Sequence, residues 1–336
     1  MGLVGALDRG QRRFPPVGLP LAVVYKFFDD QGAYLAAIIT YYAFVAVFPL
    51  LLLASSILGF LLQDNPELQQ QVLDSALAQF PIVGDQLGRP EGLTGSTSAV
   101  VVGSLVALYG SLGLGTAAQN AMNVAWSVPR NSRPNPILLR LRSLFLLVVA
   151  GSAVLGLTAL SIAIRETGLI GGEDPPVPRW VVSLAAALVL ALVLTLLFRV
   201  AAARDHPWWY AVPGGLFVAI GWQVLQVAST TYVNRVLIET SAMNQTFGLV
   251  LGLIGLIFLA AVIAVLGIEL NVVVTRRLWP RALLTPFTDG VELTPADERA
   301  YASYAKAQRH KGFEQVVVVF DKAGEAADDD DPSASR

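Results

Sequence analysis

The chain has 336 residues, of which 54% are hydrophobic and only 14% are charged. Soluble domains carry about 25% charged residues, so this composition excludes an ordinary soluble globular protein and indicates an integral membrane protein. The chain contains no cysteine, which excludes disulfide bonds and thiolate metal sites, and its two histidines leave little for a histidine-based metal centre. We therefore expect neither a metal nor a cofactor.

Residues 1–32 are predicted to form a cytoplasmic N-terminal segment with a short interfacial helix. The stretch from Leu21 to Phe28 is apolar apart from Lys26. In a helix on the membrane surface, a lysine lays its methylene stem along apolar surface and extends its ammonium group toward the headgroups. We therefore expect the ammonium group of Lys26 to be exposed.

The first predicted membrane span covers residues 34–62, a run without Asp, Glu, Lys, Arg or His. About 20 apolar residues are enough to cross the hydrocarbon of a bilayer. Pro49 lies inside the run and favours a kink, because it frees a backbone carbonyl one turn earlier. Tyr41 and Tyr42 place hydroxyl groups in the first half, where they either face other helices or lie in the interfacial aromatic belt. We expect the side that carries Tyr42, Ala46 and Pro49 to face other helices.

Five further spans are predicted, which makes residues 33–284 an all-α, six-helix transmembrane domain. The second span is rich in glycine, serine and amide side chains, and small residues allow helices to pack closely. Between the first two spans, a polar loop carries apolar residues at helical spacing and predicts a short amphipathic helix. The further spans cover residues 98–126, 143–164, 180–198, 208–231 and 247–274.

The basic residues near the predicted spans are unevenly distributed between the two sides of the membrane. Thirteen Lys and Arg residues lie in segments 1–32, 130–142, 199–204 and 276–281, whereas four lie in the alternating segments. Because basic residues accumulate on the cytoplasmic side, this asymmetry predicts that both termini are cytoplasmic.

Residues 285–336 are predicted to form an acidic, partly disordered cytoplasmic tail. This segment holds 6 Lys and Arg against 11 Asp and Glu, whereas residues 1–284 hold 17 against 14. A short helix is predicted within residues 297–311, and residues 315–320 are β-prone. The acidic block at 328–331 is of a composition that favours disorder.

Polar side chains gather in the predicted cytoplasmic half of the first, second and sixth spans. Glu269 is the only acid inside a predicted span, and a carboxylate at membrane depth marks a pathway or a partner. It either binds a proton or a cationic group during transport or pairs with Arg276, Arg277 or a loop arginine. The amides either line a pathway or hold the bundle together by interhelical hydrogen bonds. The candidate substrate-pathway residues are Tyr41, Tyr42, Pro49, Gln119, Asn120, Asn123, Glu269 and Asn271.

The sequence carries no common enzyme signature. It has no G-x-S-x-G elbow, no H-E-x-x-H helix and no G-x-x-x-x-G-K-[ST] phosphate loop. The glycine-rich segment 110–115 lies inside an apolar span, where helix packing explains it better than phosphate binding. We interpret the arginines at 130–142 as a topology signal and as contacts for anionic lipid, and not as a nucleic-acid site. We expect no catalytic residues and no nucleic-acid partner.

Four segments resemble the YihY/BrkB family of six-span bacterial inner-membrane proteins. The resemblance covers about residues 20–280 and implies a multi-pass protein of the cell membrane, often suspected of transport, without a settled biochemical function. Some relatives carried an old ribonuclease label, which the scattered acids of this chain do not support. The segments are TYYAFVAVFPLLLL at 40–53, QNAMNVAW at 119–126, WWYAVPGGLFVAIGW at 208–222 and GIELN at 267–271.

We expect a transporter or flippase-like protein for a lipid-linked or amphipathic substrate, with membrane lipids as its surroundings. The polar layer in three spans and the kink at Pro49 motivate this hypothesis. The alternatives are a scaffolding membrane protein whose tail recruits partners and, least favoured, a membrane-bound ribonuclease. Assembly into a homo-oligomer is open, as are the substrate, the direction of transport and the energy source.

Overall fold

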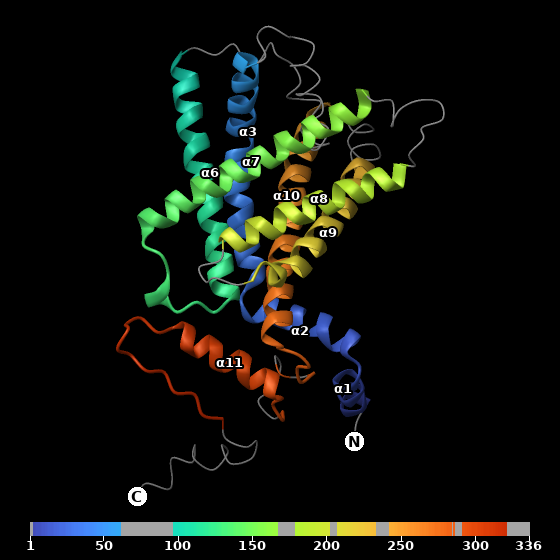
Figure 1. Cartoon of the computed structure of the whole chain (residues 1–336), viewed down its shortest axis with the longest axis vertical. Coiled ribbons are helices and arrows are strands. Elements are labelled where there is room, and N and C mark those ends of the chain that lie inside the picture. The colour runs from blue at the N-terminus through green and yellow to red at the C-terminus, as the bar shows by residue number, and fades with distance from the viewer. Residues whose placement is uncertain are drawn as a thin grey trace, which may run out of the picture.

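The computed structural model describes residues 3–61, 97–166, 179–201, 207–232, 242–283, 285 and 291–320. Within these residues the regular secondary structure is helical (Figure 1), which confirms the all-α prediction. The amphipathic helix predicted in the loop after the first span and the acidic block at 328–331 lie outside the described residues. The long helices are α3 (Gly32–Leu61), α6 (Thr97–Ala125), α7 (Pro136–Glu166), α8 (Arg179–Ala201), α9 (Val212–Tyr232) and α10 (Ala242–Arg276).

Shorter helices lie at the two ends of the described chain and in its connections. Helices α1 (Leu3–Arg13) and α2 (Pro15–Asp29) precede α3, and α11 (Pro295–Ala307) follows α10. Single 3-10 turns, η2 (Arg130–Ser132) and η3 (Trp208–Ala211), precede α7 and α9. In Figure 1, α1, α2 and α11 lie at the same end of the bundle, which is called the α11 end below.

The length and composition of the helices support the prediction that this is a membrane protein. Among the described residues, four helical stretches are long and apolar enough to cross a bilayer, and residues 32–47 form a shorter apolar helix. Each of the six predicted spans overlaps one of the long helices, while the number of crossings and the side of the termini stay predictions. The four stretches are Pro136–Ala153, Leu184–Ala201, Trp208–Tyr232 and Phe247–Arg276.

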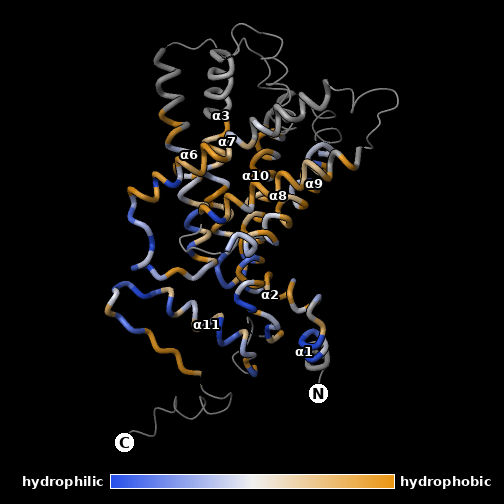
Figure 2. The backbone as a smooth tube through the Cα atoms, in the orientation of Figure 1, coloured by the Kyte–Doolittle hydropathy of each residue, from blue (hydrophilic) through white to orange (hydrophobic). Residues whose placement is uncertain are grey.

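The long helices pack as two neighbouring pairs, α3 with α6 and α8 with α9, and α10 packs mainly on one helix of each pair. Helix α3 packs on α6 and α10, α9 packs on α8 and α10, and α7 packs on α6 and α8. Hydrophobic residues predominate along the long helices, whereas hydrophilic residues concentrate in α11 and in the connection between α6 and α7 (Figure 2). The bundle therefore has an apolar body and a polar α11 end.

Helices α9 and α10 approach closely at a pair of glycines. A Cβ atom on Gly214 would overlap the backbone carbonyl oxygen of Gly267, which faces it on α10. The backbone N–H of Gly214 donates a hydrogen bond to Oδ1 of Asn271 at 2.7 Å. Because N–H groups in the first turn of a helix have no partner within the helix, Asn271 caps the start of α9 from the neighbouring helix.

Replacing Gly214 with alanine is expected to destabilise the protein by about 1–3 kcal/mol, because the new methyl group forces two backbones apart. Thermal unfolding in detergent micelles measures the loss. Gly151→Ala is the matched control, because a Cβ atom at Gly151 of α7 meets nothing within 4 Å. Equal unfolding temperatures for the two variants would contradict the tight approach of α9 and α10.

Helix α2 differs from the predicted surface helix. Its residues Val24 and Phe28 are exposed, as expected at an interface, but Lys26 is only 1% exposed. The prediction that the ammonium group of Lys26 reaches the membrane surface was therefore wrong. The physical reason is that carboxylates of Asp30 and Glu269 lie beside the ammonium group inside the protein, and a buried charge needs such partners.

The helix predicted in the tail is confirmed as α11, which begins at Pro295. Thr294 and Asp297 form a capping box, in which the Thr294 hydroxyl accepts from the backbone N–H of Asp297 at 3.1 Å. In return, Oδ2 of Asp297 accepts from the backbone N–H of Thr294 at 2.9 Å. The β-prone segment 315–320 forms no strand with any described residue, and its Val317 and Val319 are exposed.

Candidate functional site

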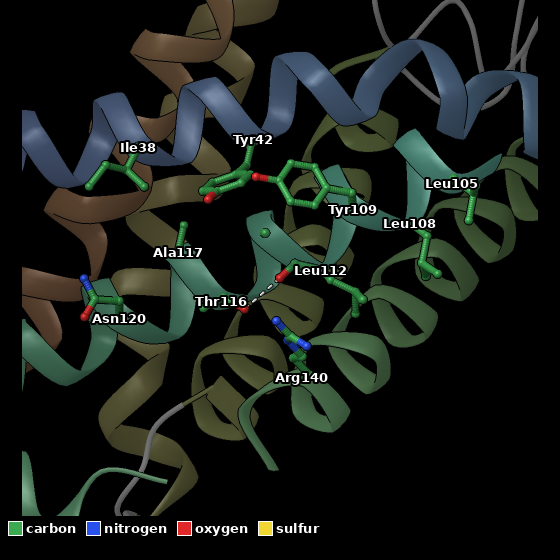
Figure 3. Close-up of a pocket in the computed structure, with 11 residues that line it drawn as sticks. Ile38, Tyr42, Leu105, Leu108, Tyr109, Leu112, Thr116, Ala117, Asn120 and Arg140 are labelled. Atoms are coloured by element: carbon green, nitrogen blue, oxygen red, sulfur yellow. Dashed lines mark hydrogen bonds between the residues drawn. The ribbon is translucent and has the colours of Figure 1, made fainter. Parts of the chain in front are cut away.

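A pocket of about 580 Å³ lies between α3, α6 and α7 (Figure 3) and is called the α6 pocket below. Ile38 and Tyr42 of α3 and Arg140 of α7 contribute to its walls. The rest of its lining comes from one face of α6, where contributing residues recur every three or four positions. These are Leu105, Leu108, Tyr109, Leu112, Gly113, Thr116, Ala117 and Asn120.

The α6 pocket has an apolar end and a polar part. Figure 3 shows Leu105 and Asn120 at opposite ends, with Arg140 facing the middle. At a rise of about 1.5 Å per residue, the stretch of α6 between these two residues is about 22 Å long. Leu105 and Leu108 are exposed on the surface of the bundle, so the pocket opens sideways where lipid chains would lie. Its volume is in the range of sites for small molecules.

Two tyrosines face each other in the α6 pocket. The ring centroids of Tyr42 and Tyr109 are 6.1 Å apart, with the rings tilted by 59°. A Cβ atom on Gly113 would overlap the ring of Tyr42, so the glycine provides the space that this ring occupies. The neighbouring Tyr41 is 57% exposed and does not line the pocket.

The predicted pathway residues do not all meet in one place. Tyr42 and Asn120 line the α6 pocket, whereas Gln119 is buried and bonds to α7. Its Nε2 donates to the carbonyl oxygen of Leu139 at 3.0 Å and to the hydroxyl of Ser143 at 2.9 Å. Gln119 thus forms the interhelical bonds that were weighed as the alternative to a pathway.

The remaining candidates have separate surroundings. Glu269 faces α2, whereas Asn271 bonds to the start of α9. Residues two positions apart on a helix point about 200° apart, which explains why these two neighbours diverge. Asn123 is buried, and its Oδ1 has no hydrogen-bond partner among the described residues. The side chain of Pro49 lies outside the described residues.

A buried ion cluster joins α2 to α10. Nζ of Lys26 lies 2.5 Å from Oδ2 of Asp30 and 3.2 Å from Oε2 of Glu269. All three side chains are at most 4% exposed. The alternative that Glu269 pairs with an arginine was wrong, because its partner is Lys26. Arg276 instead donates to the backbone carbonyl of Trp126.

A second buried ion cluster holds α11 against the bundle. The fully buried Arg281 bonds through Nε to Asp297 and lies 3.1 Å from Oδ2 of Asp29. Its guanidinium group also lies over the ring of Tyr301, 5.2 Å from the centroid. Tyr304 connects the two clusters, because its hydroxyl donates to Asp29 at 3.4 Å and its ring lies 5.2 Å from Nζ of Lys26.

The electrostatics keep both buried cations charged. Burial by itself lowers the pKa of Lys26, but the adjacent carboxylates of Glu269 and Asp30 outweigh it and raise that pKa. Burial likewise opposes the charge of Arg281, and its bonds to Asp297 and Asp29 raise the pKa above its usual value. Burial raises the pKa of Asp29, against the attraction of Arg281. Each cluster therefore holds one charged cation surrounded by acids.

Sequence reasoning missed most of these charged residues. Lys26 and Asp30 are four positions apart in a predicted helix, and this spacing could have marked them as a pair. Arg281 and Asp297 have no such signal, because the loop between them has no periodic pattern. Across the residues that the structure describes, no group of His, Asp and Glu is arranged to hold a metal ion.

The part of the chain that matches a known family includes the residues of both the α6 pocket and the Lys26 cluster. The family model described as Virulence factor BrkB matches residues 23–286, well over half of the chain. The chain belongs to the BrkB family. This result confirms the resemblance inferred from the four segments, and it places α11 outside the matched part of this BrkB-family protein.

Two curated relatives are similar to this BrkB-family chain. The ribonuclease-like protein YfkH of Bacillus subtilis is 24% identical over 266 residues, which cover 74% of this chain and 91% of YfkH. A UPF0761 membrane protein of Rhodospirillum centenum is 26% identical over 246 residues, which cover 69% of this chain and 52% of that relative. The chain therefore spans about half the length of the second relative. No solved structure matches the chain.

Proposed function

We propose that this BrkB-family protein moves an amphipathic molecule with an anionic headgroup across the bacterial inner membrane, using the α6 pocket. The combination of an apolar end and a cation in one pocket that opens toward lipid carries the proposal. Leu105 and Leu108 suit an acyl chain. A guanidinium group such as that of Arg140 binds phosphate or carboxylate oxygens, and the amide of Asn120 can add a hydrogen bond.

The dimensions of the pocket support this proposal. The face of α6 that lines it is about 22 Å long, against about 30 Å for the hydrocarbon core of a bilayer. We place the α11 end in the cytoplasm, since the basic residues predicted to be cytoplasmic gather there. In this orientation Arg140 lies toward the cytoplasmic leaflet, six helices cross the membrane, and both termini are cytoplasmic.

In this role the protein acts as a carrier and not as an enzyme. The name of YfkH describes that protein as ribonuclease-like, and the sequence of this chain shows no cluster of residues suited to general-base catalysis or to metal binding. A scaffolding role is the second candidate, because Phe313 and Val317 beyond α11 are 89% and 81% exposed. Purified protein that cleaves RNA, or that moves no lipid, would favour one of these alternatives.

Arg140→Gln is expected to slow the movement of an anionic lipid at least about tenfold, because a charge-assisted hydrogen bond is worth about 1.5–3 kcal/mol. The measurement uses purified protein in phosphatidylcholine vesicles. It follows a fluorescent phosphatidylglycerol that becomes accessible to an external quencher only after it crosses the bilayer. A fluorescent phosphatidylcholine serves as the second probe and should show a smaller effect.

Arg142→Gln is the matched control, because Arg142 lies on the same helix and does not line the α6 pocket. Both variants lose one positive charge, so a general effect of charge on reconstitution is the same for both. If the two variants slow transport equally, or if the two lipid probes respond alike, the assignment of Arg140 to the headgroup is wrong.

A further inference from the structure

The Lys26 cluster contains more negative than positive charge. Two carboxylates, Asp30 directly after α2 and Glu269 on α10, lie beside the single ammonium group of Lys26, and all three side chains are buried. If both acids were ionised, the cluster would carry a net charge of −1. An uncompensated charge in a buried site is costly, and a site of this kind gains free energy when it binds a proton.

The groups around the Lys26 cluster do not neutralise its excess of negative charge. The cation of the neighbouring cluster, Arg281, is engaged by Asp29 and Asp297, which are two further carboxylates. From α11, Tyr304 contributes a hydroxyl that donates to Asp29 and a ring that faces Lys26. The combined network therefore contains four carboxylates, on Asp29, Asp30, Glu269 and Asp297, against two cations, on Lys26 and Arg281.

A second observation concerns the carboxyl group of Glu269. The residue is fully buried, and its Oε1 has no hydrogen-bond partner among the described residues. Oδ2 of Asp30 and Oε2 of Glu269 lie 2.5 Å and 3.2 Å from the same Nζ of Lys26, so the two carboxyl groups are close enough to repel each other when both are ionised. A proton on either acid would convert this repulsion into an O–H donor facing an acceptor, as in other carboxyl pairs.

We propose that Glu269 and Asp30 form a proton-binding site beside Lys26, and that exchange of this proton drives the transport through the α6 pocket. The proton-binding site stands on the geometry of the cluster alone. Its role as an energy source rests on the proposed function, since it requires a substrate that moves.

The chain links the proton site directly to the pocket. Asp30 lies in the turn between α2 and α3, and Gly32 begins α3. Further along α3, Ile38 and Tyr42 form a wall of the α6 pocket. From Gly32 to Ile38 the helix rises about 9 Å, so a shift at the start of α3 is transmitted to Ile38 along one helix.

The chemistry of this coupling is simple. When Glu269 is ionised, its attraction to Lys26 holds α2 and α3 against α10. A proton on Glu269 removes that charge and weakens the contact with Lys26, while Asp30 retains its own contact with the ammonium group. The protonated and ionised forms thus favour different positions of the α3 wall.

Infrared difference spectroscopy of the purified full-length protein tests the proton site without any substrate. The expected result is a C=O stretching band of a protonated carboxylic acid that appears as the pH is lowered. Glu269→Gln should remove or shift this band, and Asp30→Asn should shift it and provides a second variant should Glu269→Gln fail to fold. Glu298→Gln, an exposed acid on α11, is the control and should leave the band unchanged.

Absence of the band in the wild type, or a band that neither Glu269→Gln nor Asp30→Asn changes, would overturn the proton site. The energetic role is tested in the vesicle assay with a pH gradient of either direction. We expect the gradient to change the wild-type rate several-fold, and we expect Glu269→Gln to move lipid at one rate in both directions of the gradient.

The two proposals fail in distinguishable ways. A wild-type rate that ignores the pH gradient overturns the coupling and leaves the proposed function in place. A wild-type protein that moves no lipid overturns the proposed function, and the infrared band then decides the proton site by itself. Arg140→Gln should keep the band while it slows transport, because Arg140 lies outside the Lys26 cluster.

Discussion

Replacing Arg281 with methionine is expected to release α11 from the bundle. The guanidinium group is fully buried and bonds to Asp29 and Asp297, so its removal leaves two carboxylates without their cation. Breaking a buried ion pair in this way costs about 3–5 kcal/mol. Methionine keeps much of the side-chain volume, so the loss reports the charge more than a cavity. Hydrogen exchange of the backbone amides in residues 295–307 measures the release.

The matched control for this prediction is Lys306→Met, which removes a positive charge from an exposed position on α11. It should leave the exchange rates of the helix nearly unchanged. Substituting both Arg281 and Asp297 should cost less than the sum of the two single substitutions, since each loses the same interaction. If exchange in α11 is as slow in Arg281→Met as in the wild type, Arg281 does not hold the helix.

Replacing Gly113 with leucine is expected to block the α6 pocket and to slow transport at least about tenfold, the effect of about 1.4 kcal/mol on a barrier. Any side chain at this position meets the ring of Tyr42, which itself lines the pocket. The leucine itself then fills part of the remaining volume. The vesicle assay with the anionic lipid measures the loss, and thermal unfolding shows whether the variant still folds.

The control for the pocket prediction is Gly151→Leu on α7, where an added Cβ atom meets no neighbouring atom within 4 Å. It adds the same apolar volume to the bundle without entering the pocket. Combining Gly113→Leu with Tyr42→Ala should restore part of the rate, because the smaller side chain at position 42 returns space. A folded Gly113→Leu variant with the wild-type rate would exclude the α6 pocket as the route.

The positions of the helices could be predicted because they depend on local properties of the chain. The absence of charge between residues 34 and 62 predicted α3, and similar runs predicted the others. The start of α7 shows the limit of this method. Hydropathy placed it at Ser143, whereas the helix begins at Pro136 and carries Arg140 and Arg142 on its first turns. Hydropathy identifies the residues that can lie in the hydrocarbon of a membrane. It does not show how far the helix extends beyond those residues.

The candidate site could be predicted only in part. Tyr42 and Asn120 were chosen for their polarity inside apolar runs, and the structure places both on the α6 pocket. Arg140 was read as a contact for anionic lipid but not as part of a site. The pocket itself depends on the angle at which α3 and α7 pack against one face of α6, and sequence spacing on α6 alone does not give that angle.

The sequence by itself determined that this is a helical membrane protein with an acidic tail and a short helix in that tail. These features follow from run length and charge content, which involve residues near one another in the chain. Only the tertiary structure decided that Lys26 turns inward to Glu269 and that Arg281 holds α11. A buried charge takes whichever opposite charges the packing of distant helices brings within a few ångströms, and no local pattern encodes that choice.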